Sequence, residues 1–584
     1  MDKDNLYKIR HSAEHVFAQA VKELYGDKVQ LGVAHITDAG FSNDAKWDVK
    51  LSEDNFGKIE KRMQQIIDKD LPITQKEITR EEARELFKDN PFKLEWIDQW
   101  DAQEKTLTVY WTGDKYVDFC KGPHVSSTGQ IKAFKLLSVA GAYWRGDANN
   151  EMLTRTYGTA FETKAELDEY LAMLEEAKKR DHRKLGKELG LFTFSDLVGS
   201  GLPMFTPKGT YLWQELANFS ESLQRAAGFE QVKIPHITKT DLYKKSGHWD
   251  KFGDELFLVK SQETDDEMVL KPMNCPHHTQ IYASAKRSYR DLPIRYFETT
   301  TNYRDEKAGE LSGLSRVRSL TQDDAHVFCR IDQIEGEFTI IMNMIKTMYA
   351  ALGLEFRARL SFRDPATPEK YHGEDSTWDQ AQKIIEDIAK KLDINYYLAI
   401  GEAAFYGPKI DIMVKDSLGR EWQCATEQLD FVQPTRFELK YTDKDGQEKT
   451  PVMIHKALLG SVERFLSVYI EHTAGSFPAW LSYTQVSVLP ISSDKHSDYA
   501  YQVKEELKAL GIRVDVDDAN ETLGNKIRKA QSQKVPYVFV VGDKEIESNT
   551  VSVRVSGGQD LGAMTVADIA ARIIEKVANK SIDL

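Results

Sequence analysis

Arg316-Val-Arg-Ser-Leu-Thr-Gln-Asp-Asp-Ala-His326 joins two arginines, two carboxylates and a histidine in one short segment. A thiol and a second imidazole stand elsewhere in the chain, at Cys275 in Met-Asn-Cys-Pro and at His455 in Ile-His-Lys-Ala. Cys275, His326 and His455 are too far apart in the sequence for a zinc finger, whose ligands are closely spaced. A zinc site with three protein ligands keeps one coordination position for a substrate. For each residue taken alone, an ordinary buried cysteine or histidine remains the alternative.

Arginine stands beside carboxylate in two further segments, Tyr303-Arg304-Asp305-Glu306 and Gly460-Ser-Val-Glu-Arg464-Phe465. Guanidinium groups bind phosphate through two parallel hydrogen bonds and keep their charge, so two such arginines suit a triphosphate. Together with the three zinc-type ligands, they predict an enzyme that holds a small ligand on zinc beside a nucleotide.

The bulk properties set wide limits. A chain of 584 residues is long enough for about four domains. The formal net charge of −14 argues against indiscriminate binding of nucleic acid but leaves a specific complex open, because a local basic stripe is sufficient. Only four cysteines are present and no apolar run approaches a membrane span. We therefore expect a cytoplasmic protein without disulfides that does not associate with membranes.

The pattern of the chain changes along its length, and it predicts a multidomain protein of α+β and α/β parts. Residues 1–162 mix a helix from about Arg10 to Tyr25 with short strands at 106–111 and 116–119. Thr163-Lys-Ala-Glu166 is typical of a capping box and opens a predicted connecting helix in 163–190. Residues 191–482 are mixed and β-rich. In 483–584 strands alternate with helices, which predicts a small α/β domain with a mainly parallel sheet.

The chain resembles the threonyl-tRNA synthetases, a family of class II aminoacyl-tRNA synthetases. The resemblance is densest in Lys271–Pro276, Arg316–His326, Gly407–Asp411 and His455–Phe465. It implies an editing domain in 1–162, a linker in 163–190, an antiparallel-sheet catalytic core in 191–482 and an anticodon-binding domain in 483–584. The helix predicted at 209–227, with a strand ending at Pro235, would be the first class II motif, so we expect a homodimer. Family members usually begin with a β-grasp domain, which we expect to be absent here.

The resemblance also implies roles for residues of the core. Cys275, His326 and His455 correspond to the ligands of one Zn²⁺ per chain. The residues implied in catalysis on ATP, which is accompanied by Mg²⁺, are Arg304, Glu306, Arg464 and Lys409. The residues implied around threonine and ATP are Arg316, Gln322, Asp324, Tyr406 and Gln428. Leu320 departs from the family, whose members often carry a phenylalanine there that stacks on adenine.

A second cluster lies near the start of the chain. His11-Ser-Ala-Glu-His15 places two imidazoles on one helical face, and Cys120-Lys-Gly-Pro-His124 adds a thiol and a third imidazole. These residue types by themselves predict a second zinc site. The resemblance implies instead a hydrolytic editing pocket, with Lys93 as an assisting lysine. Such a pocket is needed because serine differs from threonine by one methyl group, which is worth only about 1–3 kcal/mol in binding. Serine will therefore be attached to the tRNA by mistake and must be removed.

Three residues near the end of the chain correspond to positions that contact the anticodon in the family: Asn520, Glu545 and Arg554. Amide, carboxylate and guanidinium groups suit hydrogen bonds to the edges of unpaired bases. The alternative is an ordinary solvated loop and strand edge. A basic helix at 525–534, with Lys526 and Arg528, is expected to contact the tRNA backbone or to be a solvent-facing surface.

The predicted function is ATP-dependent ligation of L-threonine to tRNA(Thr) through threonyl-adenylate, with hydrolysis of mischarged seryl-tRNA(Thr). One alternative is a non-catalytic paralogue that binds RNA, which the presence of Arg304, Arg464 and the three zinc-type ligands disfavours. Another is a synthetase for serine or proline, which the spacing of those ligands and the His11–His15 motif disfavour.

Overall fold

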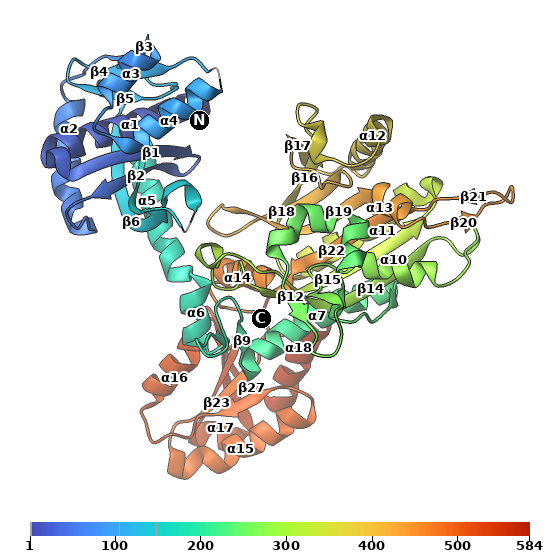
Figure 1. Ribbon diagram of the computed structural model, residues 1–584. Helices are drawn as coiled ribbons and strands as arrows, with labels where there is room; N and C mark the ends of the chain where they lie inside the picture. Colours follow the sequence, from blue (N-terminus) through green and yellow to red (C-terminus); the bar gives the residue numbers. More distant parts are fainter. Residues whose placement is uncertain (1–2, 104, 148) are drawn as a thin grey trace. The chain divides into compact units, whose positions relative to one another are not determined.

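The computed structural model describes residues 3–103, 105–147 and 149–584 and divides into two compact units, Met1–Glu175 and Glu176–Leu584 (Figure 1). The division lies inside the segment predicted as a linker. Within the described residues, no helix has the length and apolar character needed to cross a membrane.

The first unit is built on a four-stranded antiparallel sheet. Its strands, in spatial order, are β1 (Val29–Thr37), β2 (Gly40–Trp47), β7 (Met152–Phe161) and β6 (Ala133–Tyr143). Helix α1 (Lys3–Tyr25) packs on this sheet, and α2 (Phe56–Ile67) packs on α1. The helix predicted from about Arg10 therefore begins earlier, while its end at Tyr25 is confirmed.

A smaller sheet in the same unit has its own core. Its strands are β3 (Ile73–Glu77), β4 (Thr108–Thr112) and β5 (Tyr116–Phe119), and its helices are α3 (Arg80–Leu86) and α4 (Pro91–Ala102). The Asn90 side chain caps α4 by accepting hydrogen bonds from the backbone N–H groups of Phe92 and Lys93. This cap places Lys93 in the first turn of the helix.

The connecting segment contains two helices rather than the one that was predicted. The capping box is confirmed: Thr163 N donates to Glu166 Oε2 over 3.0 Å, and Glu166 N donates to Thr163 Oγ1 over 3.2 Å. Helix α5 (Lys164–Arg180) nevertheless ends before α6 (His182–Leu189). The break arises because the Asp181 carboxylate accepts from Arg183 N at 2.8 Å and so caps a new helix.

An eight-stranded sheet forms the centre of the second unit. Its strands, in spatial order, are β10 (Glu230–Gln231), β14 (Ile294–Tyr303), β15 (Ser319–Cys329), β22 (Val452–Ser461), β19 (Glu421–Asp430), β18 (Lys409–Lys415), β16 (Phe356–Phe362) and β17 (Tyr396–Ile400). The six inner strands pair antiparallel and the two edge strands pair parallel. The antiparallel core sheet is thus confirmed.

Three long helices bury apolar side chains against one face of this sheet: α7 (Pro207–Ala226), α11 (Ile334–Ala351) and α14 (Val462–Thr473). Successive side chains of a strand point to opposite faces. In β15, Ala325 and Val327 belong to the core under these helices, so Asp324 and His326 point to the other face. The sheet therefore separates an apolar layer from a polar one.

The strand predicted to end at Pro235 is shorter than expected. It is β10 (Glu230–Gln231), and the chain then leaves the sheet. Beyond it, the Ile234 N–H donates to the side-chain carboxylate of Glu298 on β14 over 3.4 Å rather than to a backbone carbonyl of that strand.

Smaller elements complete this part of the chain. They are β8 (Phe192–Thr193), β9 (Met204–Phe205), β11 (Ile237–Lys239), α8 (Thr240–Ser246), α9 (His248–Phe252), β12 (Leu258–Lys260), β13 (Glu267–Leu270), α10 (Cys275–Ala283), α12 (Asp375–Lys391), α13 (Val432–Arg436), β20 (Tyr441–Thr442) and β21 (Glu448–Lys449).

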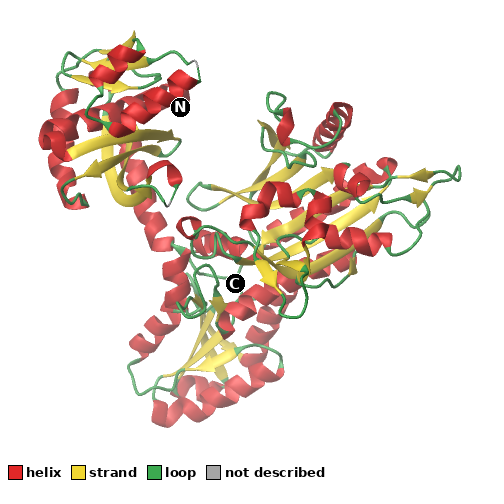
Figure 2. Cartoon of the chain, in the orientation of Figure 1, coloured by secondary structure: helices red, strands yellow, loops and turns green. Residues whose placement is uncertain are grey.

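The last hundred residues form a five-stranded sheet with helices packed around it (Figure 2). Its strands, in spatial order, are β24 (Val514–Val516), β23 (Val486–Pro490), β25 (Tyr537–Val541), β26 (Thr550–Val555) and β27 (Asp560–Thr565), and its helices are α15 (Ser493–Ala509), α16 (Leu523–Ser532), α17 (Asp543–Ser548) and α18 (Val566–Ala578). The first three strands are parallel, whereas β26 and β27 pair antiparallel, so the sheet is mixed. Strand β27, which is mostly exposed, was not predicted.

Candidate functional site

A cavity of about 260 Å³ lies on the polar face of the eight-stranded sheet. Because residues two apart on a strand share a face, Gln322, Asp324 and His326 of β15 all line it. The predicted site residues that the structure brings together here are Cys275, Arg304, Gln322, Asp324, His326, Tyr406, Gln428 and His455.

The three zinc-type side chains converge in this cavity. Cys275, His326 and His455 each offer a ligand atom, and these atoms lie within 4.8 Å of one another. The antiparallel pairing of β15 with β22 sets His326 directly opposite His455, with Nε2 of the first 3.1 Å from Nδ1 of the second. Two nitrogens bound tetrahedrally at about 2.0–2.1 Å from a zinc ion lie about 3.3 Å apart. The donor set and its spacing therefore fit zinc.

A carboxylate orients one of these ligands. Asp430 Oδ2 lies 2.8 Å from His455 Nε2, which places the ring proton on Nε2 and leaves Nδ1 free for a metal. His278, which the sequence did not single out, lies behind the other imidazole, with its Nδ1 2.8 Å from His326 Nδ1. Burial lowers the pKa of His278 to about 3, so this ring is neutral. The adjacent pair His277-His278, just after Cys275, was the available signal.

A chain of hydrogen bonds reaches the cavity at Asp324. Asn274 Nδ2 donates to Asp324 Oδ2 over 3.0 Å, and Lys271 Nζ donates to Asn274 Oδ1 over 2.8 Å. Burial raises the pKa of Asp324 to about 6. The hydroxyl of Tyr406 donates to Gln428 Oε1 over 2.5 Å. These contacts hold a carboxyl group beside the predicted zinc ligands.

The predicted ATP residues fall into two groups. Arg304 lines the cavity, and its buried Nε has no hydrogen-bond partner among the described residues. The others do not line it: Glu306 pairs with Arg316 over 2.7 Å, Lys409 pairs with Asp411 over 2.6 Å, and Arg464 is exposed in the first turn of α14. Of these four residues, Arg304 is thus the one that lines the cavity with a donor that no described residue engages.

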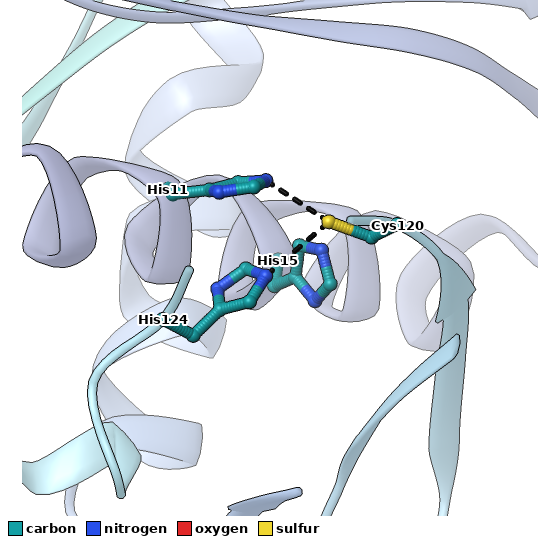
Figure 3. Close-up of side chains that lie close together, drawn as sticks. All are labelled: His11, His15, Cys120 and His124. Atoms are coloured by element: carbon teal, nitrogen blue, oxygen red, sulfur yellow. Dashed lines mark hydrogen bonds between the residues drawn. The ribbon is translucent and has the colours of Figure 1, made fainter. Parts of the chain in front are cut away.

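A second cavity, of about 300 Å³, lies in the first unit. His11 and His15 project into the region from α1, one helical turn apart, and Cys120 and His124 come from the segment after β5 (Figure 3). Ligand atoms of all four lie within 4.8 Å of one another. Cys120 Sγ is 3.1 Å from His11 Nε2 and 3.4 Å from His124 Nε2. The structure therefore brings this predicted cluster together, with Lys93 on the same cavity wall.

The proton positions in this cluster follow from its outer contacts. His11 Nδ1 lies 3.2 Å from the Pro123 carbonyl, so Nδ1 carries the proton and Nε2 faces Cys120 as an acceptor. Burial lowers the pKa of His11 to about 4 and raises that of Cys120 to about 12, so both groups are neutral near pH 7.

Charged groups also line this cavity. Lys93 Nζ and Asp118 Oδ1 form a buried ion pair of 2.7 Å. Burial alone would lower the pKa of Lys93, but the charge and hydrogen bond of Asp118 more than offset it, so its pKa is raised. Burial and Asp118 together raise the pKa of Glu14 to about 8. Lys93 therefore stays charged in the cavity.

A third group of metal-type side chains is already satisfied. His182 Nδ1 lies 2.7 Å from Glu471 Oε1, and His182 Nε2 accepts from Leu314 N over 3.1 Å. Both ring nitrogens are engaged, so this group with Asp181 offers no imidazole lone pair to a metal.

Of the predicted anticodon residues, Asn520 and Arg554 are exposed and Glu545 is half-buried. Asn520 is in the loop before α16, Arg554 is exposed on β26, and Glu545 accepts from Gly542 N at 3.0 Å in the first turn of α17. The expectation for α16 was wrong at Lys526, which is wholly buried and donates to the Pro490 carbonyl over 3.0 Å. Arg528 on the same helix is exposed.

Three known families match successive parts of the chain. Residues 107–157 match the "Threonyl and Alanyl tRNA synthetase second additional domain", 257–473 the "tRNA synthetase class II core domain (G, H, P, S and T)" and 485–576 the "Anticodon binding domain". A threonine–tRNA ligase from Staphylococcus carnosus (strain TM300) is 47% identical over 98% of this chain and 88% of that protein. The chain belongs to the threonine–tRNA ligase family.

Solved structures agree with this membership. One described as the RNA binding domain of threonyl-tRNA synthetase from Cryptosporidium parvum Iowa II has a TM-score of 0.63 and 37% identity, covering 69% of this chain and 99% of that one. A putative threonyl-tRNA synthetase from Aeropyrum pernix has a TM-score of 0.62 and 28% identity, covering 69% and 97%. The protein is therefore a class II aminoacyl-tRNA synthetase of the threonine family, which uses ATP with Mg²⁺ and carries an editing-type domain.

Proposed function

We propose that the protein joins L-threonine to tRNA(Thr) through a threonyl-adenylate, selects threonine on zinc held by Cys275, His326 and His455, and hydrolyses seryl-tRNA(Thr) in the N-terminal cavity. The observation that carries this proposal is the shared cavity, in which the facing nitrogens of His326 and His455 lie with Arg304, whose Nε has no hydrogen-bond partner among the described residues. The proposed domains are those inferred above: 1–162, 163–190, 191–482 and 483–584.

Adenylate formation joins two anions. A threonine carboxylate oxygen attacks the α-phosphorus of ATP, a P–O bond forms, and the bond to pyrophosphate breaks. Arg304 stabilises the charge that gathers on the phosphate oxygens, and its Nε is a donor without a partner among the described residues. The 3′-terminal ribose of tRNA then displaces AMP from the adenylate, giving the aminoacyl ester.

Selection of threonine over valine needs more than an apolar pocket, because the two side chains have nearly the same shape. Zinc, when bound, supplies a Lewis acid that takes the amine and hydroxyl of threonine, and valine has no hydroxyl to offer. Asp324 lies 3.8 Å from His326 Nε2. From there it accepts hydrogen bonds from the amine and hydroxyl of threonine. Tyr406 stacks on His455 at 4.8 Å and holds that ring in place.

Editing requires addition of water to the ester of seryl-tRNA. We assign His11 as the acceptor of a proton from water as the oxygen attacks the carbonyl carbon, which requires water to replace the Cys120 thiol at Nε2, and the ribose oxygen leaves with a proton. The products are serine and tRNA with a free terminal hydroxyl. Lys93 contributes a fixed positive charge on the cavity wall.

A structural metal in the N-terminal cluster is the second candidate, favoured by the four ligand-type side chains within 4.8 Å. We further propose a homodimer and a cytoplasmic location.

Two assays test these proposals. Amino-acid-dependent pyrophosphate exchange with threonine, serine, valine and proline, with zinc content measured on the same sample, tests activation. Threonine should give the fastest exchange, with about one zinc per chain. Deacylation of preformed seryl-tRNA(Thr) tests editing, and a rate no faster than in buffer would rule it out. A second zinc per chain would favour the structural-metal alternative.

A further inference from the structure

Glu14 is a polar wall residue of the N-terminal cavity to which the proposed hydrolysis gives no role. Its side chain is wholly buried and lies in the α1 turn between His11 and His15. Oε1 accepts a hydrogen bond from Asn43 Nδ2 over 2.6 Å. Oε2 is buried and has no hydrogen-bond partner among the described residues. Buried polar atoms are rarely left unpaired, so this oxygen marks a place for a donor from outside the chain.

The charges around Glu14 indicate what kind of donor fits. The other carboxyl group on the cavity wall, Asp118, is already paired with Lys93 over 2.7 Å and also accepts from the Tyr116 hydroxyl over 3.2 Å. His11 and Cys120 are neutral near pH 7. Lys121 lines the cavity but is exposed to solvent. Among the described residues of the wall, Glu14 is thus a carboxyl group without a bound cation.

The ligand of an editing pocket carries a matching charge. An aminoacyl ester of tRNA bears an α-ammonium group close to the carbonyl carbon that is hydrolysed. Burying an ammonium group away from water is unfavourable unless a carboxylate pairs with it. We propose that Glu14 binds the α-ammonium group of the aminoacyl moiety in the N-terminal cavity. This assignment rests on the proposed editing function and makes Glu14 a determinant of substrate binding rather than of proton transfer.

The test separates the ammonium group from the rest of the substrate. Seryl-tRNA and its α-hydroxy analogue, in which glyceric acid replaces serine, differ only at that group. The Glu14→Gln variant keeps the size of the side chain and an oxygen for Asn43, but it cannot form the carboxylate that a bound ammonium group would stabilise. Hydrogen bonds to charged groups are worth about 10- to 150-fold in binding. Glu14→Gln should therefore lower kcat/KM for seryl-tRNA by about that factor, mainly through KM, and change the analogue by less than about threefold.

Two controls guard against a structural effect. Glu53→Gln changes an exposed carboxylate of the same unit and should leave both deacylation rates unaltered. Threonine-dependent pyrophosphate exchange should be normal in Glu14→Gln, because that chemistry belongs to the other cavity. The wild-type protein supplies a measurement that needs no variant: it should itself prefer seryl-tRNA to the α-hydroxy analogue.

The possible outcomes separate this inference from the function on which it rests. If the wild type fails to deacylate seryl-tRNA, the editing function itself is wrong. If the wild type deacylates both substrates equally well, editing stands and the role of Glu14 is overturned. The same holds if Glu14→Gln lowers kcat/KM for both substrates to the same extent, or for neither. Selective loss on seryl-tRNA supports it.

Discussion

The two His/Cys clusters contain the same kinds of side chain in different surroundings. In the central cavity two imidazole nitrogens face each other at 3.1 Å, and Asp430 fixes the ring of His455 from behind. In the N-terminal cavity the Cys120 thiol sits between two imidazoles at 3.1 and 3.4 Å, and a backbone carbonyl fixes His11. The first arrangement presents lone pairs to a metal, whereas the second pairs them with a thiol.

The charged residues beside the two clusters also differ. The central cavity holds an arginine whose Nε is unpaired among the described residues, which suits a phosphate. The N-terminal cavity holds Lys93, which is already paired with Asp118. It also holds Glu14, whose Oε2 has no hydrogen-bond partner among the described residues. The comparison teaches that ligand-type residues alone do not define a site. The groups that face them determine which charge the cavity accepts.

The largest expected effect concerns phosphate chemistry in the central cavity. Arg304→Ala should reduce threonine-dependent pyrophosphate exchange by about 10²- to 10³-fold, since it removes a preorganised charged donor from the transition state. Deacylation of seryl-tRNA should be unchanged in the same variant. Arg290→Ala, which removes an exposed arginine, is the matched control. Normal exchange in Arg304→Ala would show that ATP is held by other groups.

The second largest effect is expected on zinc content, which should depend on the central cluster and not on the N-terminal one. Cys275→Ser should lower zinc content below the expected one per chain and reduce threonine activation by at least about 10- to 100-fold, the range seen when even an outer partner of a metal ligand is lost. Cys120→Ser should leave both quantities unchanged. Zinc content by atomic absorption and pyrophosphate exchange on the same samples decide this. Full activity in a metal-free Cys275→Ser protein would exclude the role of zinc.

Loss of editing should appear only as misacylation. His11→Ala should leave threonine activation intact while seryl-tRNA(Thr) accumulates, with serine charged at about 1/10 to 1/200 of the efficiency of threonine. Lys93→Ala should show a weaker form of the same defect. Acid gels of charged tRNA measure the accumulation. If these variants instead lose a second zinc ion and unfold the N-terminal unit, the cluster is a structural metal site.

The pH dependence of deacylation should reflect the buried state of His11. Burial lowers its pKa to about 4, and only the neutral ring accepts a proton from water. Protonation of His11 should therefore lower the rate only as the pH approaches 4 and should have no effect between pH 6 and 8. Deacylation of seryl-tRNA measured across this range checks the expectation. A decline centred near pH 6.5, the value of an exposed histidine, would contradict it.

The smallest effect is expected at adenine. Leu320 is buried on β15, and an aromatic ring there would add a stacking interaction of about 0.5–1.5 kcal/mol. Leu320→Phe should lower the KM for ATP by about two- to tenfold, with the threonine KM unchanged. An unaltered ATP KM would show that adenine is held without this contact.

Much of the fold was accessible from local patterns. The capping box at Thr163 and the end of α1 at Tyr25 depend on neighbouring residues alone, and both were predicted correctly. The break at Asp181 was missed, because a carboxylate that caps a helix resembles any other acidic residue within a basic helix. β27 was missed because its residues, Asp-Leu-Gly-Ala-Met-Thr, show no regular alternation of apolar and polar side chains, and it is defined only by pairing with β26.

The sites divide in a similar way. Residue type and family resemblance were enough to name Cys275, His326, His455 and the N-terminal cluster. They were not enough to find His278, Asp430 or the open oxygen of Glu14, nor to place Lys526 in the interior. The role of each of these groups depends on which buried groups face it in the folded protein. Those partners come from distant parts of the chain.

By itself, therefore, the sequence determined the family, the main elements and the kinds of ligand that the protein carries, because these depend on residue identity and short-range spacing. The tertiary structure alone decided which atoms face one another. His326 and His455 are 129 residues apart, yet strand pairing brings their nitrogens to 3.1 Å. Burial then sets the charge of each group, since desolvation depends on everything packed around it. For that reason only the folded chain separates a cavity that fits a metal and a phosphate from one that fits an ammonium group.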